Sequence, residues 1–170
     1  MISNFKLDRI NWQTVVLFVL GFWLSGSLVL DGLILPGLSA TGMMAQSDFA
    51  SAGYLIFGIF NHLELLCAAL VLTGMLVLYR HHSFTHTKQS WSILLSGILL
   101  AIAIIYTYIL TPQMSGLGMQ LNLFEAATVM PSRMISMHEE YWGLELVKFV
   151  AGVILLRWCY QESCSLKTGN

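Results

Sequence analysis

The sequence predicts an all-α membrane protein: a four-helix transmembrane bundle with a short interfacial helix between spans three and four. Three observations predict this fold. Hydrophobic residues make up 56% of the 170 positions and charged residues only 10%, whereas a soluble domain carries roughly 25% charged residues. Four segments are long and apolar enough for a bilayer core, which takes about 20 helical residues. Lysine and arginine residues gather on one side of the resulting topology.

The four predicted spans form a single membrane domain over residues 1–170. They cover about 12–35, 53–79, 91–110 and 141–160. Tryptophans stand at the expected span ends, as an aromatic belt at the membrane interface requires: Trp12, Trp91, Trp142 and Trp158. Two pairs of small residues spaced four apart would let helices approach closely: Gly21/Ser25 and Gly97/Ala101.

The third span is the most apolar and is predicted to stop at Pro112. Apolar residues in the segment 112–140 that follows predict a short helix on the membrane surface: Leu121, Leu123, Phe124 and Ala127. Pro131 suits the first turn of a helix that continues into span four, because a proline there lacks an N–H that would be unpaired anyway.

Positive charge sets the orientation. Six cationic residues flank the spans on one side: Lys6, Arg9, Arg80, Lys88, Arg157 and Lys167. The other side has only Arg133, so both ends of the chain are expected in the cytoplasm. The partner implied is the lipid bilayer. A net charge of −1 argues against a nucleic-acid partner, because little charge is available to neutralise phosphates.

Ionisable groups inside spans are costly, so each needs a partner or a function. Nine residues are therefore candidates for a polar pocket that opens toward the outer face: Asp31, Asn61, His62, Glu64, Tyr106, His138, Tyr141, Glu145 and Lys148. The last four follow a 3-4-3 spacing, which places them on one helix face. Glu64 is the expected partner of Lys148, with Glu145 helping and Asp31 next.

Two interpretations of these residues stay open. A buried ion pair can fix the register of helices without any chemistry, and Asp31 would then bond to Tyr106 or a neighbouring hydroxyl. Alternatively, the residues form a pocket for an ion or a small polar ligand. His62 and Glu64 diverge by roughly 160° around their helix, which argues against a compact metal site there.

Methionines gather in the outer segments, and thioether and imidazole ligands suit Cu(I). Met134, Met137 and His138 are the candidate copper ligands. Methionine also fills gaps at apolar boundaries, so no cofactor is predicted beyond this copper hypothesis. We find no nucleophile elbow, phosphate loop or HExxH motif, so a non-enzymatic role is favoured.

Four stretches resemble a known family: Trp23 to Pro36, Gly53-Tyr-Leu-Ile-Phe57-Gly, Asn61-His62-Leu-Glu64, and His138-x-x-Tyr141-x-x-x-Glu145-x-x-Lys148. They resemble small four-span membrane proteins that form a domain of unknown function in cyanobacteria and other bacteria, with TMEM-type eukaryotic relatives. That family looks distantly similar to CopD-type copper-resistance membrane domains. The resemblance implies a four-helix membrane domain with the same candidate residues, in a bacterial inner membrane or a thylakoid membrane.

We therefore expect a multi-pass protein that binds or translocates a small ion through this pocket. The alternative is a structural or assembly subunit that docks against a larger membrane complex, or against a second copy of itself. A third hypothesis is a membrane redox or copper-handling protein.

Overall fold

A computed structural model describes residues 11–43, 49–80, 86–124 and 132–168, and every element in these ranges is helical. The elements are α1 (Trp12–Val29), η1 (Leu30–Ile34), α2 (Leu35–Ala40), α3 (Phe49–Arg80), α4 (His86–Ile105), η3 (Tyr106–Leu110), α5 (Thr111–Phe124) and α6 (Ser132–Thr168). Elements α1, η1 and α2 form one continuous helix, as do α4, η3 and α5. The predicted all-α class is confirmed.

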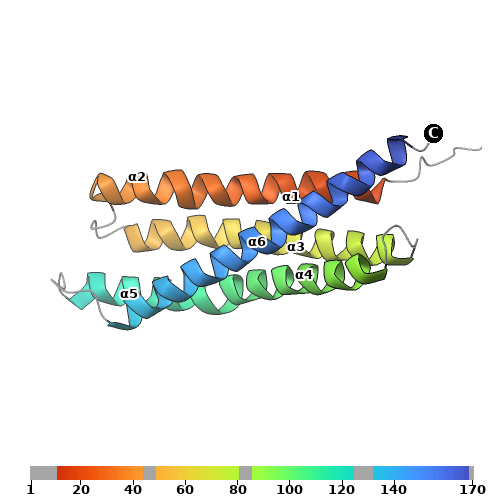
Figure 1. The fold of residues 1–170 in the computed structure, drawn as a ribbon. Coiled ribbons are helices and arrows are strands. Elements are labelled where there is room, and N and C mark those ends of the chain that lie inside the picture. The colour runs from red at the N-terminus through yellow and green to blue at the C-terminus, as the bar shows by residue number, and fades with distance from the viewer. Residues whose placement is uncertain (1–10, 44–48, 81–85, 125–131, 169–170) are drawn as a thin grey trace, which may run out of the picture.

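The four long helices form a bundle in the ring order α1, α3, α4, α6, with each helix packed against its two neighbours. Helices α3 and α6 therefore occupy opposite corners. Figure 1 shows α6 crossing the other helices obliquely, from the end of the bundle that holds α5 to the end where α1 begins. At that second end, Gln13 Nε2 donates to the carbonyl oxygen of Cys159 at 3.0 Å, which ties the start of α1 to α6.

Three helices are long and apolar enough to cross a membrane: Trp12–Ala40, Ser51–Arg80 and Lys88–Met119. Helix α6 runs the length of the bundle but is not among them. Its apolar part carries three charged residues, Glu145, Lys148 and Arg157, and this charge distinguishes it from the other three helices.

The first and third helices each contain one π-helical turn, and both turns are followed at the same distance by a proline. In η1 the N–H of Leu35 bonds to the carbonyl of Leu30, and Pro36 comes next. In η3 the N–H of Thr111 bonds to the carbonyl of Tyr106, and Pro112 comes next. Each proline thus falls in the first turn of the α-helix that restarts, where its missing N–H is tolerated.

Two helices continue beyond the predicted ends of their spans. The first helix passes the expected end near Leu35 and continues to Ala40, and the third passes Pro112 and continues to Phe124. The first part of segment 112–140 is thus a direct continuation of the third helix rather than a separate surface helix. Ala127 and Pro131 lie outside the described residues, as do the side chains of Leu121, Leu123 and Phe124.

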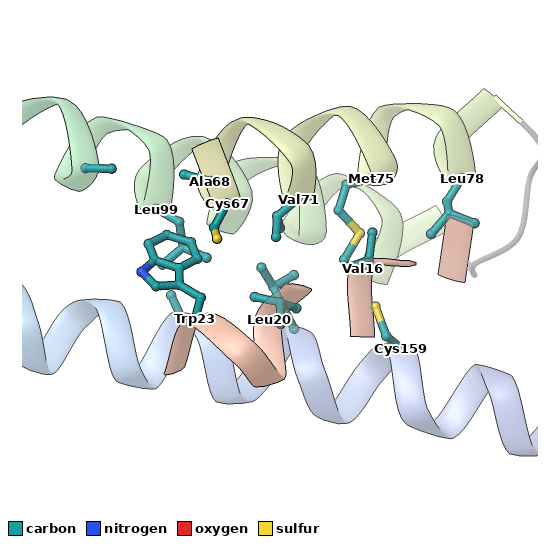
Figure 2. Packing of buried hydrophobic residues seen from close by; sticks show 13 residues of the cluster. Val16, Leu20, Trp23, Cys67, Ala68, Val71, Met75, Leu78, Leu99 and Cys159 are labelled. Atoms are coloured by element: carbon teal, nitrogen blue, oxygen red, sulfur yellow. The ribbon is translucent and has the colours of Figure 1, made fainter. Parts of the chain in front are cut away.

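An apolar core fills the half of the bundle where α1 begins. Figure 2 shows Val16 and Leu20 of α1 facing Val71 and Met75 of α3, with Cys159 of α6 beside them. All five are at most 1% exposed. This half of the bundle is closed by packed side chains.

Close helix approaches occur at glycines other than the predicted ones. A Cβ on Gly74 would collide with Val16, and a Cβ on Gly152 would lie 2.8 Å from Leu24 Cδ2. Gly21 and Gly97 have open space around them, and their partners Ser25 and Ala101 are exposed. The two predicted small-residue pairs therefore do not mediate helix contacts within the described bundle.

Candidate functional site

Lys148 of α6 lies at the centre of a buried polar cluster. Its side chain is 1% exposed, and Nζ lies 2.6 Å from Glu64 Oε1 on α3 and 2.7 Å from Glu145 Oε2 on α6. The Nζ atom also stands 5.4 Å from the ring centroid of Tyr106. The ion pair expected between Lys148 and Glu64 is confirmed, with Glu145 as the second partner.

Glu64 is held by donors from two other helices. Besides Lys148, Trp23 Nε1 and Ser27 Oγ of α1 each donate to Glu64 Oε1 at 2.9 Å. Trp23 and Ser27 are one helical turn apart, so one face of α1 presents both donors. Hydrogen bonds from neutral and charged donors stabilise the ionised form of a buried carboxylate.

Two tyrosines connect the cluster to its outer part. The hydroxyl of Tyr106, in η3, lies 3.0 Å from Glu145 Oε2 and 3.1 Å from the carbonyl oxygen of Tyr141, and it donates its single proton to these acceptors. The rings of Tyr106 and Tyr141 stack with centroids 5.1 Å apart. The hydroxyl of Tyr141 in turn donates to Asp31 Oδ1 at 2.6 Å.

Two carboxylate oxygens in this cluster are buried and have no hydrogen-bond donor among the described residues: Oδ2 of Asp31 and Oε1 of Glu145. Buried polar atoms in proteins are almost always paired, so each exception calls for a physical reason. The charge balance is also unequal. With all groups ionised, Asp31, Glu64 and Glu145 contribute −3 and Lys148 contributes +1, which leaves −2 on side chains that are 1–3% exposed.

Asn61 of α3 stabilises the π turn η3 rather than contacting the charges. Its Nδ2 donates to Thr111 Oγ1 at 2.6 Å and to the carbonyl oxygen of Tyr106 at 3.4 Å. Thr107 Oγ1 donates to the carbonyl oxygens of Ala103 at 2.7 Å and Asn61 at 3.3 Å. These bonds link α3 to η3 and to the start of α5, and so support the turn that carries Tyr106.

The two candidate histidines are not brought into the cluster. His62 is exposed on the outside of α3, with Nδ1 2.7 Å from the carbonyl oxygen of Gly58. His138 is exposed on α6, with Nδ1 2.8 Å from the carbonyl oxygen of Met134. The expectation that both line one pocket with the carboxylates was wrong. Periodicity around α3 already places His62 away from Glu64.

The three candidate copper ligands do not share one environment. Met134 and Met137 are 7% and 6% exposed, whereas His138 is exposed. Met137 also lines a pocket of about 230 Å³ at the end of the bundle that holds α5, together with Pro112, Gln113, Gly116, Leu117 and Arg133. Within the described part of the chain, no three His, Cys, Asp or Glu side chains are grouped closely enough to hold a metal ion.

Several residues of the cluster were not predicted from the sequence: Trp23, Ser27, Thr107 and Thr111. A signal was present for Trp23, because it falls inside a span and its indole N–H needs an acceptor there. Comparison of the chain with protein-family models, with curated proteins and with solved structures found no match.

Proposed function

We propose that this chain is a four-span membrane protein that binds a small cation at the Lys148 cluster and passes it across the bilayer. The observation that carries the proposal is the excess of buried carboxylates. Compensating Lys148 requires one carboxylate, whereas three are present, and two of their oxygens lack donors. A cation is the ligand that such an excess of negative charge attracts.

The distribution of side chains around α6 supports its role as the fourth span. Glu145 and Lys148 point into the bundle and are buried. At the same level, the outward face of α6 is apolar, with Leu146, Val150 and Val153 each more than half exposed. A helix that is polar inside and apolar outside suits lipid rather than water. Its end beside the start of α1 also agrees with an even number of crossings.

The proposed topology places both ends of the chain in the cytoplasm of a bacterial cell or on the matching side of a thylakoid. Its support is the excess of Lys and Arg at that end. Reporter fusions after residues 10, 85 and 165 should report the cytoplasm, and fusions near 45 and 125 the opposite side. A cytoplasmic signal at residue 45 would exclude the four-span topology.

The cation is proposed to enter from the non-cytoplasmic side. Asp31 and Tyr141 form the outer edge of the cluster, and the pocket beside Met137 lies one helical turn further out. Toward the cytoplasm, the apolar core around Leu20 and Met75 closes the bundle. Passage through to that side therefore requires the helices to move apart, whereas binding does not.

A second candidate role is that of a subunit in a larger membrane assembly or a homo-oligomer. The exposed imidazole of His62 favours it, because a polar group on a lipid-facing surface gains stability from a neighbouring helix. The full pairing of Lys148 is also what a structural ion pair requires.

Proteoliposomes loaded with dyes for protons, sodium or potassium test the proposed function. Wild-type protein should speed the entry of one of these cations, and Glu145→Gln should abolish the effect. Glu140→Gln is the matched control, because Glu140 is exposed on the same helix. Rates equal to those of protein-free liposomes for all three cations would reject transport, and His62-dependent oligomers would then favour the subunit role.

A further inference from the structure

We propose that Asp31 and Glu145 form a carboxyl pair that binds one proton between Oδ2 of Asp31 and Oε1 of Glu145. The proposal rests on the proposed function, because it names the cation and locates it within the cluster. Asp31 is 3% exposed and Glu145 is 2% exposed, so the pair is shielded from bulk water.

The two carboxyl groups are bonded in the same way. Each uses one oxygen for donors of the protein: Oδ1 of Asp31 accepts from Tyr141, and Oε2 of Glu145 accepts from Tyr106 and Lys148. Each leaves its second oxygen buried without a donor. In each carboxyl group, one oxygen thus has a hydrogen-bond donor and the other has none. The two remaining oxygens need a hydrogen that no described side chain supplies.

The pair is brought together by Tyr141. Its hydroxyl reaches from α6 to Asp31 on η1, and Glu145 follows one helical turn later on the same face of α6. Tyr106 bonds both to Glu145 and to the backbone of Tyr141, so Asp31 and Glu145 are brought to the same part of the bundle, as a shared proton requires. Two adjacent carboxylates in a buried site do not both ionise readily, and they share a proton instead.

The space around the two oxygens decides which cation they can bind. The unpaired oxygens are inaccessible to a water molecule, whether from outside or from an internal cavity. A hard metal cation needs roughly six or more oxygen ligands, and the described carboxylates are not grouped to supply a metal site. A proton needs only two oxygens at about 2.5–2.7 Å from one another. The site as built therefore has room for a proton and for nothing larger.

The other groups that face the pair determine which carboxylates stay charged. From α6 these are Tyr141 and Lys148, from η3 Tyr106, and from α3 Glu64. Glu64 has three donors on one oxygen, one of them the ammonium group of Lys148, and is the carboxylate that pairs with this cation. The shared proton then reduces the net charge of the cluster from −2 to −1.

Infrared spectroscopy of the full chain in lipid bilayers tests the pair. A protonated carboxyl group has a carbonyl stretch separate from that of carboxylate, and this band shifts in D₂O. The wild type should show the band at neutral pH. Asp31→Asn should remove it, because Glu145 then faces only Lys148 and ionises, whereas Glu64→Gln should retain it. Glu140→Gln, which alters an exposed carboxyl group of α6, should also retain it in full.

A second variant keeps the test decisive if Asp31→Asn does not fold. Tyr141→Phe retains both carboxyl groups but removes the donor to Asp31, so the band should stay and shift in frequency. A band that does not move, or one that is lost only with Glu64→Gln, would overturn the proposal. Absence of the band together with cation flux in proteoliposomes would overturn the proton pair and leave the proposed function standing. The band without flux would support the pair and reject transport.

Discussion

Lys148 and Glu64 lie on helices at opposite corners of the bundle, yet their charged atoms meet at 2.6 Å. Helices α3 and α6 do not pack directly against one another in the described bundle, so the lysine stem spans the interior between α1 and α4. The contact therefore fixes the level of α6 against that of α3, although only one side chain from each helix takes part. Such a diagonal ion pair specifies the register between two helices that do not pack against one another.

Replacing Lys148 alone should destabilise the protein more than replacing Lys148 and Glu64 together. Lys148→Met leaves Glu64 and Glu145 buried without their cation, at a cost of about 3–5 kcal/mol. Adding Glu64→Gln to that variant should recover part of the loss. Thermal unfolding in detergent measures both effects, with Arg157→Met, an exposed cation of the same helix, as the control. Strictly additive losses would show that Lys148 and Glu64 do not interact.

Each of the two hydrogen bonds from α1 to the Glu64 carboxylate should contribute to the free energy of unfolding. Trp23→Phe and Ser27→Ala each remove one bond to Glu64 Oε1 and should each cost about 1.5–3 kcal/mol. Unfolding in detergent again gives the measurement. Trp142→Phe and Ser25→Ala repeat the same changes at exposed positions and should have little effect. Equal losses at the exposed and buried positions would contradict the geometry.

The number and order of helices followed from hydropathy, because a long apolar segment without water must satisfy its backbone as a helix. The ends of the first and third helices did not follow. The first span was predicted to end near Leu35 and the third at Pro112, yet Pro36 and Pro112 each follow a π turn and lie in the first turn of a continuing helix. A π turn is stabilised by tertiary contacts, such as those that Asn61 makes with η3, and local sequence does not encode them.

The ion pair of Lys148 and Glu64 could be predicted from the sequence. A lysine inside a span must meet a carboxylate, and Glu64 was the one at a matching depth. The role of Tyr141 as the donor to Asp31 needed the oblique path of α6, which no periodicity gives. His62 was included because of its depth alone, and depth does not say which side of a helix faces the bundle.

Alanine should lower the stability of the protein at Gly74 and Gly152 but not at Gly97. In Gly74→Ala the new methyl group meets Val16, and in Gly152→Ala it meets Leu24. Such overpacking costs about 1–3 kcal/mol. Gly97 has open space around it, so Gly97→Ala should stabilise its helix by roughly 0.5–1 kcal/mol. Thermal unfolding of the three variants checks this difference in sign, and a loss of stability in Gly97→Ala would show that another helix covers that position.

The copper hypothesis has a direct elemental test. We expect joint replacement of Met134, Met137 and His138 to leave the copper content of the purified protein unchanged. The reason is that both methionines are buried in packing, while the imidazole is exposed and its Nδ1 faces a backbone carbonyl. Mass spectrometry of metals in wild type and variant provides the comparison. A stoichiometric copper content that the variant loses would establish a site at the outer end of α6.

Asn61 and His62 are adjacent in the sequence, and their leucine variants should behave in opposite ways. Asn61→Leu removes the buried donor to Thr111 Oγ1 and the second donor to the carbonyl of Tyr106, at a cost of about 1–3 kcal/mol. It should also slow cation entry, because the backbone of Tyr106 loses its bond to α3 while its hydroxyl bonds to Glu145. His62→Leu replaces an exposed imidazole with an apolar side chain on a lipid-facing surface, so it should leave stability and cation entry unchanged.

Unfolding in detergent and flux in proteoliposomes measure the two properties on the same preparations. A His62→Leu variant that retains flux but loses an oligomeric form seen for the wild type would assign His62 to an interface between subunits. Equal effects of the two variants on flux would mean that both side chains face the cation, contrary to their placement on α3.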